Sequence, residues 1–204
     1  MISKDLSFMK GMVNMLTFGK KISFRPLLIS LIFFFLFGFL FWGVISSLFG
    51  DKFIFLGWLI GAAMFLLVAG LYYPNVIKYE FNYFEITDKQ INYYDLSSWW
   101  KRFKLVLFGR NIAMKSIDLK AIKSASLIGQ KDFQKMPPSL TFPLYLTFSS
   151  GINAMIQNPC KLELKLSNGE KLSLLMNRDM VYDPGQTVKK GKQAVKMIQN
   201  STNA

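Results

Sequence analysis

The chain has 204 residues and a formal net charge of +13, from 25 Lys and Arg against 12 Asp and Glu, and 51% of its residues are hydrophobic. It contains no histidine, which excludes Ser-His and Cys-His nucleophilic catalysis and every metal site that uses histidine. Cys160 is the single cysteine, so no disulfide can form within the chain, as is typical of proteins in a reducing compartment. We therefore expect a protein that is not an enzyme and that carries no cofactor and no metal.

Residues 1–25 are expected to form an amphipathic helix that lies in the membrane interface. Gly19 is a typical helix stop, and the lysines before it fall mostly off the apolar stripe. A basic amphipathic helix directly before a membrane span is suited to the interface. The alternative is that the stripe packs against the C-terminal domain. The apolar residues of the stripe recur at helical spacing and are Ile2, Leu6, Met9, Val13 and Leu16.

Residues 26–74 are expected to form a two-helix transmembrane hairpin. Residues 26–49 and 53–73 are two uncharged apolar segments. Each has the length of about 20 residues that a helix needs to cross a hydrocarbon core of about 30 Å. Asp51 and Lys52 form the turn between them. Since ion and proton pathways usually need charged groups within the spans, the sequence argues against a channel or transporter that works alone.

The charge on either side of the hairpin predicts the orientation of the protein. Residues 1–25 carry five basic residues and one acidic residue, and the segment after Tyr73 carries nineteen and ten. Cytoplasmic segments are enriched in Lys and Arg, so both termini are expected in the cytoplasm of a two-pass protein of the cell (plasma or inner) membrane. Lys20, Lys21 and Arg25, directly before the first span, dominate this prediction.

Small residues in the second span predict close packing of the two helices. Gly57 and Gly61 are one helical turn apart, so they lie on the same face. Small residues let membrane helices approach closely, and the first span is the nearest partner in a hairpin. The same spacing could instead mediate self-association.

Residues 75–204 are expected to form one cytoplasmic α+β domain. Pro74 and Asn75 are predicted to end the second span, and the hydrophobic period then changes to that of strands. Asn168-Gly169 between two alternating Leu-rich runs is the strongest short signal of a β-hairpin. The strands are expected at residues 79–85, at 91–96, within 113–127, at 140–148, at 162–166 and at 172–175, which makes about six or seven antiparallel strands. The candidate core residues of the middle strands are Ile117, Leu119, Ile122 and Leu127.

A C-terminal helix is predicted to cover one face or end of this sheet. Asp183-Pro184 supplies an N-cap residue followed by a proline at the first helical position. Several lysines of the helix are expected on its solvated face. The apolar face consists of Val188, Gly191, Ala194, Val195 and Ile198.

Two stretches resemble bacterial two-span membrane proteins with a pleckstrin-homology-like (bacterial PH) cytoplasmic domain. Residues 83–91, YFEITDKQI, are similar to the opening hairpin of that family, and residues 116–124, SIDLKAIKS, are similar to a core strand. The resemblance extends over about residues 72–200 and implies a PH-like antiparallel β sandwich or barrel with a C-terminal helix. It also implies membrane-associated scaffolding or resistance to membrane-active peptides, without catalytic residues. Two-span proteins of the EbsA type are the alternative resemblance.

The candidate binding residues form one short cluster, Trp99, Trp100, Lys101, Arg102 and Lys104. Tryptophan pairs favour the headgroup region, and nearby cations attract anionic lipid. The cluster therefore predicts a lipid interface. The alternative is that the tryptophans belong to the core of the sheet while the cations are solvated.

The most concrete expectation is a non-enzymatic membrane protein that presents a basic PH-like domain at the cytoplasmic membrane face, as a scaffold or accessory. Its expected partners are the bilayer, including anionic lipids, and a membrane protein or a second copy of the chain, but not nucleic acid. One alternative is an immunity or stress-resistance factor against membrane-active peptides. Another is an accessory subunit of a channel or secretion complex.

Overall fold

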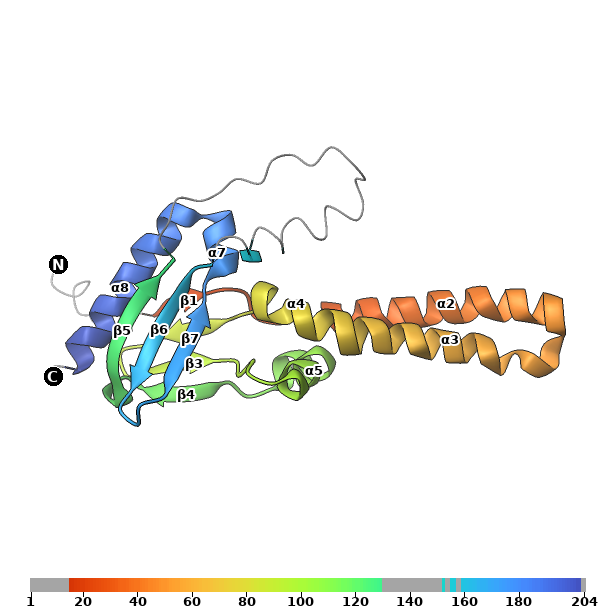
Figure 1. Ribbon diagram of the computed structural model, residues 1–204, viewed down its shortest axis with the longest axis horizontal. Coiled ribbons are helices and arrows are strands. Elements are labelled where there is room, and N and C mark those ends of the chain that lie inside the picture. The colour runs from red at the N-terminus through yellow and green to blue at the C-terminus, as the bar shows by residue number, and fades with distance from the viewer. Residues whose placement is uncertain (1–14, 130–151, 153–154, 157–158, 203–204) are drawn as a thin grey trace, which may run out of the picture. The chain divides into compact units, whose positions relative to one another are not determined.

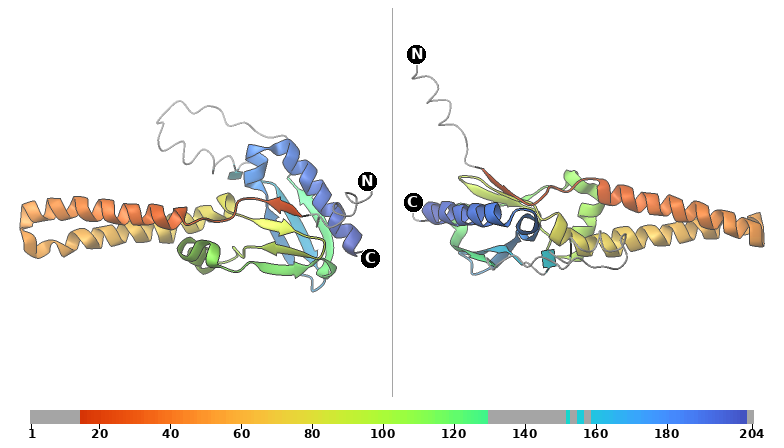
Figure 2. Two further views of the ribbon diagram at one scale, coloured as in Figure 1. Left: turned by 180° about the vertical axis from the view of Figure 1, so that it is seen from behind. Right: turned by 90° about the horizontal axis from the view of Figure 1, so that it is seen from above.

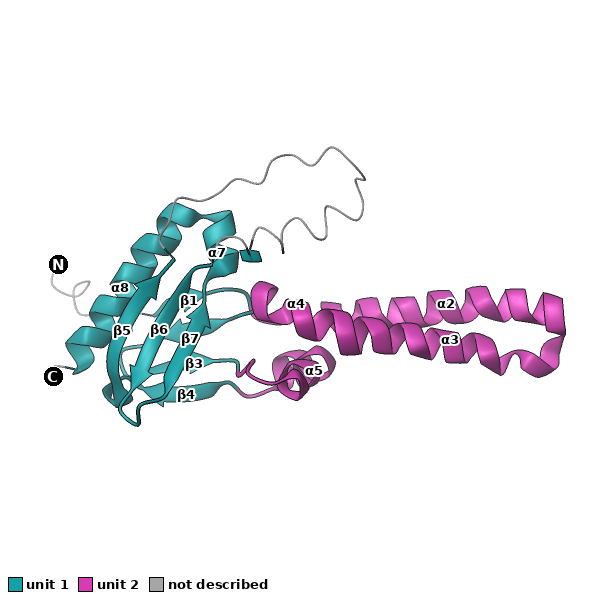
Figure 3. Ribbon diagram, viewed as in Figure 1, with its two compact units in different colours: residues 1–20, 82–94, 114–204 teal, residues 21–81, 95–113 magenta. Residues whose placement is uncertain are grey.

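The computed structural model describes residues 15–129, 152, 155–156 and 159–202. The chain forms two compact units, which Figure 3 shows in different colours. The first unit comprises residues 1–20, 82–94 and 114–204, and the second comprises residues 21–81 and 95–113. These units differ from the three consecutive segments expected from the sequence, because residues 95–113 make their contacts with the helical hairpin.

The hairpin of the second unit consists of two antiparallel helical arms (Figure 1). Both arms are long and apolar enough to cross a membrane, by length and composition. The first arm is α2 (Arg25–Phe49), which begins with a proline in its first turn. The second arm runs from Asp51 to Glu80 through η1 (Asp51–Phe53), α3 (Phe55–Leu66), η2 (Leu67–Tyr72) and α4 (Tyr73–Glu80).

The second arm does not end at Pro74, so the expected helix end was wrong. The segment η2 is wound as a π-helix, and the N–H of Tyr73 bonds to the carbonyl of Val68, five residues earlier. This widened turn lets α4 start afresh, and Pro74 lies in its first turn. The first N–H groups of a helix have no partner within it, so proline is tolerated there.

The second unit also contains a helix that the sequence analysis did not assign, α5 (Trp99–Phe108). It contacts α4, η2 and α2, and it is followed by the short turn η3 (Gly109–Asn111). Leu105 and Val106 are buried on it. The apolar residues of this segment therefore belong to the helical unit rather than to a sheet.

The described part of the first unit contains two antiparallel sheets and two α-helices. Strands β1 to β4 form one sheet in the order β1-β2-β3-β4, and β5 to β7 form the other in the order β5-β6-β7. Helix α8 lies alongside β5 in each view of Figure 2. The elements are β1 (Leu16–Phe18), β2 (Phe84–Ile86), β3 (Gln90–Tyr93), β4 (Lys115–Asp118), η4 (Leu119–Ala121), β5 (Ile122–Ile128), β6 (Lys161–Leu166), β7 (Lys171–Leu175), α7 (Asn177–Tyr182) and α8 (Pro184–Thr202).

One hydrophobic core joins both sheets to α7 and α8. Phe84, Ile86 and Ile91 enter it from the first sheet, and Leu162 and Leu164 enter it from the second. Burying a large apolar side chain stabilises a fold by about 1.5–3 kcal/mol, so these residues hold the sheets together. The architecture is an antiparallel sheet unit with a C-terminal helix, and its two sheets do not close into a barrel.

Several local predictions within this unit are confirmed. The β6–β7 hairpin turns at Asn168-Gly169, where Gly169 has a φ of 87° that favours glycine. The carboxylate of Asp183 accepts a hydrogen bond of 3.0 Å from the N–H of Gln186, as an N-cap does. Leu119 and Ile122 are buried in the core, while Ile117 and Leu127 pack against it.

The predicted helix at residues 1–25 is corrected where the structure describes it. Leu16–Phe18 is the edge strand β1, paired with β2, and Phe18 is fully buried with its ring 4.7 Å from that of Phe84. Alternation of Leu16 and Phe18 suits a half-buried strand as well as it suits a helix. Residues 1–14, which carry most of the apolar stripe, lie outside the described residues.

The strand expected at residues 79–85 is also corrected. Tyr79 and Glu80 belong to α4, and β2 begins only at Phe84. The aromatic alternation of this stretch was misleading because Tyr79 and Tyr83 are also one helical turn apart. The strand expected at residues 140–148 lies outside the described residues.

Candidate functional site

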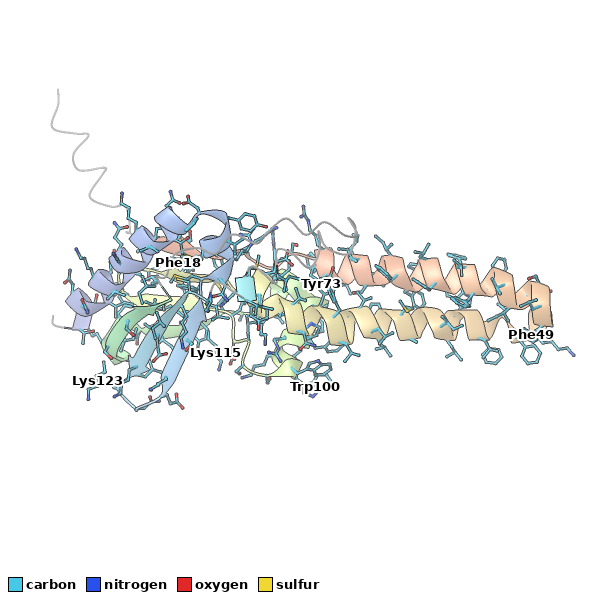
Figure 4. The ribbon with its side chains drawn as sticks, turned by 45° about the horizontal axis from the view of Figure 1, so that its top comes forward. Phe18, Phe49, Tyr73, Trp100, Lys115 and Lys123 are labelled. Atoms are coloured by element: carbon cyan, nitrogen blue, oxygen red, sulfur yellow. The ribbon has the colours of Figure 1, made fainter. Side chains whose placement is uncertain are left out.

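The hairpin exposes an apolar surface along both of its arms. The most apolar windows of the two arms are only 17% and 22% buried within the structure. Leu28 is 57% exposed near the start of α2, and Leu48 is 69% exposed near its end. Figure 4 shows side chains projecting outward along both arms. A contiguous apolar surface of this kind needs a cover, either lipid or protein.

The two predicted packing glycines lie where α3 meets α2. A Cβ at Gly57 would lie 2.5 Å from the backbone nitrogen of Trp42, and one at Gly61 would lie 2.6 Å from the carbonyl oxygen of Phe34. Gly38 of α2 lies against the ring of Trp58 from the other side of the contact. The two backbones therefore approach at a distance that only glycine permits.

Polar residues before α5 fix the start of this helix. Ser98 is its N-cap, and its hydroxyl accepts a hydrogen bond of 3.4 Å from the N–H of Lys101. The carboxylate of Asp95 accepts bonds from the N–H and the hydroxyl of Ser97. Lys101 also donates to Asp95 at 2.8 Å, so this cation is held at the beginning of α5.

A hydrogen bond from Trp99 attaches α5 to the second arm. The indole N–H donates to the carbonyl of Gly70 at 2.9 Å. In an α-helix, the carbonyl of Gly70 would accept a hydrogen bond from the N–H of the residue four positions later. That residue is Pro74, which has no N–H. The ring of Trp99 also stacks on Phe103, with centroids 5.1 Å apart and planes 6° apart. The indole therefore supplies this helix carbonyl with a donor from outside its own helix.

The remaining members of the predicted cluster differ in exposure. Trp100 is 63% exposed and projects outward from α5 (Figure 4), and Tyr72 on the second arm is 45% exposed. Lys101 and Lys104 are exposed, whereas Arg102 is half-buried. The cluster thus belongs to a helix beside the hairpin, and its aromatic residues lie outside the core of the sheets.

Positive charge collects at this end of the hairpin. Three basic residues were predicted to determine the topology. Two of them, Lys21 and Arg25, are exposed at the start of α2, and the third, Lys20, is half-buried in the first unit. The turn at the opposite end has one charge of each sign, Asp51 and Lys52. The basic residues of the second unit away from that turn are Lys21, Arg25, Lys78, Lys101, Arg102, Lys104 and Arg110, and the acidic ones are Glu80 and Asp95.

Titratable groups of the first unit are occupied in structural contacts. Burial raises the pKa of the Cys160 thiol to about 11, with a further contribution from Asp179, so the thiol stays protonated near neutral pH. Burial, followed by its hydrogen bond to Glu85, raises the pKa of the Tyr83 phenol. The hydrogen bond from Lys161 lowers the pKa of Glu163 on the sheet surface.

A pocket of about 210 Å³ lies between β1, α7 and the start of α8. Its two carboxylates already accept backbone hydrogen bonds, Asp179 from Gly19 at 2.7 Å and Asp183 from Gln186 at 3.0 Å. Within the described ranges, no three His, Cys, Asp or Glu side chains are grouped so that they could hold a metal ion.

Sequence reasoning missed the residues that position the cluster. Ser98 before an apolar run with helical period is a recognisable N-cap signal for α5. Gly70 and Pro74 carry no such signal, because their role depends on a contact with Trp99 that is distant in sequence.

Comparison with known proteins finds no matching family model, no matching curated protein and no matching solved structure.

Proposed function

We propose that this chain is a two-pass protein of the cell membrane, in which the hairpin crosses the bilayer and anchors the sheet unit at the cytoplasmic face. In this proposal the sheet unit is a non-enzymatic interaction module, a scaffold or accessory for a membrane-protein partner or for anionic lipid. The supporting observation is the exposed apolar surface of the hairpin, which has an excess of cations at one end only.

Lipid is the cover that best fits this surface. An α-helix satisfies its own backbone hydrogen bonds, so the two arms need no polar partner within a hydrocarbon core. Trp100 is 63% exposed and Tyr72 is 45% exposed beside the open end of the hairpin, and amphipathic rings of this kind prefer the headgroup region. The exposed Lys101 and Lys104 then lie where anionic headgroups attract each cation by about 1 kcal/mol.

The distribution of charge supports the cytoplasmic orientation. Cations outnumber acidic groups at the open end, and the turn is neutral overall. The chain passes between the two units four times, at residues 20/21, 81/82, 94/95 and 113/114. These points all lie outside the apolar arms, so the sheet unit and the cations remain on one side of the bilayer.

We further propose that the sheet unit is a divergent relative of PH-like domains. Its antiparallel strands, followed by a long C-terminal helix, agree with that resemblance. The two separate sheets are an open form of the sandwich or barrel expected for the family.

Cysteine labelling of intact cells tests the proposed topology. The natural Cys160 has no exposed surface, so a membrane-impermeant maleimide reports mainly on introduced cysteines. Asp51→Cys in the turn should react in intact cells, whereas Lys171→Cys in β7 should react only after permeabilisation. Labelling of Lys171→Cys in intact cells would contradict the orientation, and extraction of the wild-type chain by alkaline carbonate would contradict membrane insertion.

A partner search tests the proposed role of the sheet unit. The full chain is isolated in a mild detergent after cross-linking in native membranes, and specific cross-links to a membrane protein, to a second copy or to anionic lipid are expected. The matched control is the chain with Lys165→Glu and Lys171→Glu, two exposed residues that face each other across β6 and β7. A chain without any of these cross-links would argue against a scaffold or accessory.

A further inference from the structure

Two buried side-chain polar atoms have no hydrogen-bond partner among the described residues, Arg102 Nε and Ser23 Oγ. Both belong to the second unit. More than nine in ten buried polar groups in native proteins are paired, and an unpaired one costs about 1–3 kcal/mol. An unpaired guanidinium N–H is the more costly of the two because it belongs to a charged group. A missing partner is therefore the first explanation to consider.

The two atoms come from segments that meet at the open end of the hairpin. Arg102 is one turn from Trp99 and Val106, so it lies on the face of α5 that contacts the hairpin. Ser23 precedes α2, and the neighbouring ring of Phe24 lies 3.3 Å from a Cβ built at Gly109, the C-cap of α5. The start of α2 therefore lies beside the C-terminal end of α5, while Arg102 lies in the first turn of α5.

The local charge selects an anion as the partner. This end of the unit has cations in excess, and of its two acidic residues Asp95 is bonded to Lys101 and Ser97. Guanidinium donors form a planar fork that matches phosphate oxygens, and a hydroxyl adds a further donor. Basic pockets between membrane helices on the cytoplasmic side are a typical form of headgroup site.

We propose that Arg102 binds the phosphate group of an anionic phospholipid where α5 packs against the hairpin, with Ser23 before α2 as a candidate second donor. This inference rests on the membrane placement proposed above and adds a defined site to it. Trp100, which is 63% exposed on the same helix, lies beside the lipid and contacts its glycerol region. The site orders one lipid molecule, in contrast to the diffuse attraction exerted by Lys101 and Lys104.

Lipid retention by the full chain tests this site. The protein is reconstituted in nanodiscs of phosphatidylcholine with and without phosphatidylglycerol, released into the gas phase, and its bound lipid is counted by native mass spectrometry. The wild type should retain phosphatidylglycerol. Arg102→Gln should reduce retention at least about tenfold, as expected for loss of one charge-assisted hydrogen bond. Arg102→Lys should lose most of it as well, because an ammonium lacks the planar fork.

Matched variants separate a built site from surface charge. Lys104→Gln removes the same charge from an exposed position of α5 and should lower retention by no more than about fivefold, the loss of its general attraction for anionic headgroups. Equal losses in Arg102→Gln and Lys104→Gln would overturn the site and assign the effect to general attraction. Ser23→Ala should weaken retention by less than Arg102→Gln, and unchanged retention would remove Ser23 from the proposal.

Two further measurements distinguish lipid phosphate from free phosphate, and failure of this site from failure of the proposed membrane insertion. Inorganic phosphate added to the lipid-free protein in detergent should not bind measurably, and tight binding there would assign the site to free phosphate. Cysteine labelling of Arg102→Gln should reproduce the topology of the wild type. A wild type that inserts as proposed and retains no phosphatidylglycerol would overturn this inference and leave the proposed function standing.

Discussion

Replacing Trp99 by Phe tests whether the indole N–H holds α5 to the hairpin. The variant keeps an aromatic ring that can stack on Phe103, but it deletes the donor of the 2.9 Å bond to the carbonyl of Gly70. Gly70 is buried, so water cannot readily replace this donor. The expected result is a weaker attachment of α5.

The size of the loss follows from the state of the acceptor. Removing one partner of a buried hydrogen bond costs about 1–3 kcal/mol, because the other group stays desolvated without a partner. Pro74 cannot compensate, since it has no N–H. For a chain of this size each kcal/mol corresponds to about 2–4 °C in the midpoint of thermal unfolding. Trp99→Phe should therefore lower the midpoint by several degrees.

Circular dichroism of the full chain in detergent micelles measures this midpoint. Trp100→Phe is the matched control, because that indole is 63% exposed on the same helix and should tolerate the change. A loss in Trp99→Phe no larger than that in Trp100→Phe would refute the reasoning.

A double-mutant cycle tests the role of Pro74 in the same contact. Pro74→Ala restores an N–H four residues after Gly70, so the carbonyl gains a donor from its own helix. Trp99→Phe should then cost less in the Pro74→Ala background than in the wild type. Equal costs in both backgrounds would show that the indole does not compensate for the proline.

Three further variants probe packing and burial. Gly57→Ala should destabilise the hairpin by about 1–3 kcal/mol in thermal unfolding, because the added Cβ meets the backbone of α2. Gly43→Ala is the control and should be neutral, because a Cβ there has no neighbour within 4 Å. Asn177→Ala should cost about 1–3 kcal/mol in denaturant unfolding, since the buried amide bridges the N–H of Cys160 and the carbonyl of Met155. Burial raises the pKa of the Cys160 thiol from 9.0 to about 11, so the folded chain holds this proton more tightly than the unfolded chain. The corresponding stability is fully present below pH 9 and is lost as the pH rises through 11. Cys160→Ala should flatten this part of the curve of unfolding free energy against pH. A wild-type curve like that of the variant would contradict the raised pKa of Cys160.

Elements whose signals are local could be predicted from the sequence. The β6–β7 hairpin depends on Asn168-Gly169 between alternating leucines, and α8 begins at an N-cap aspartate followed by a proline. Both signals act within a few residues, so tertiary contacts do not change them. The two apolar arms are of the same kind, because length and hydrophobicity alone make them candidates for membrane spans.

Elements that depend on distant contacts could not be predicted. Leu16–Phe18 becomes a strand because Phe84–Ile86 offers an edge to pair with, although a helical stripe passes through Leu16. Pro74 predicts a helix end, but the π-wound turn before it and the indole of Trp99 allow the helix to continue. In each case the partner lies tens of residues away, where neither periodicity nor turn chemistry can identify it.

The assignment of α5 to the hairpin determines how the function should be tested. A fragment that begins at Asn75 looks like a complete cytoplasmic domain by sequence order, but it lacks Gly70, to which Trp99 donates its hydrogen bond. It also lacks η2 and α2, which α5 contacts, so Leu105 and Val106 would lose part of their cover. Such a fragment would expose new apolar surface and bind lipid or protein nonspecifically. Because the cluster is built jointly by the hairpin and α5, the proposed lipid and partner binding should be tested with the full chain in a membrane.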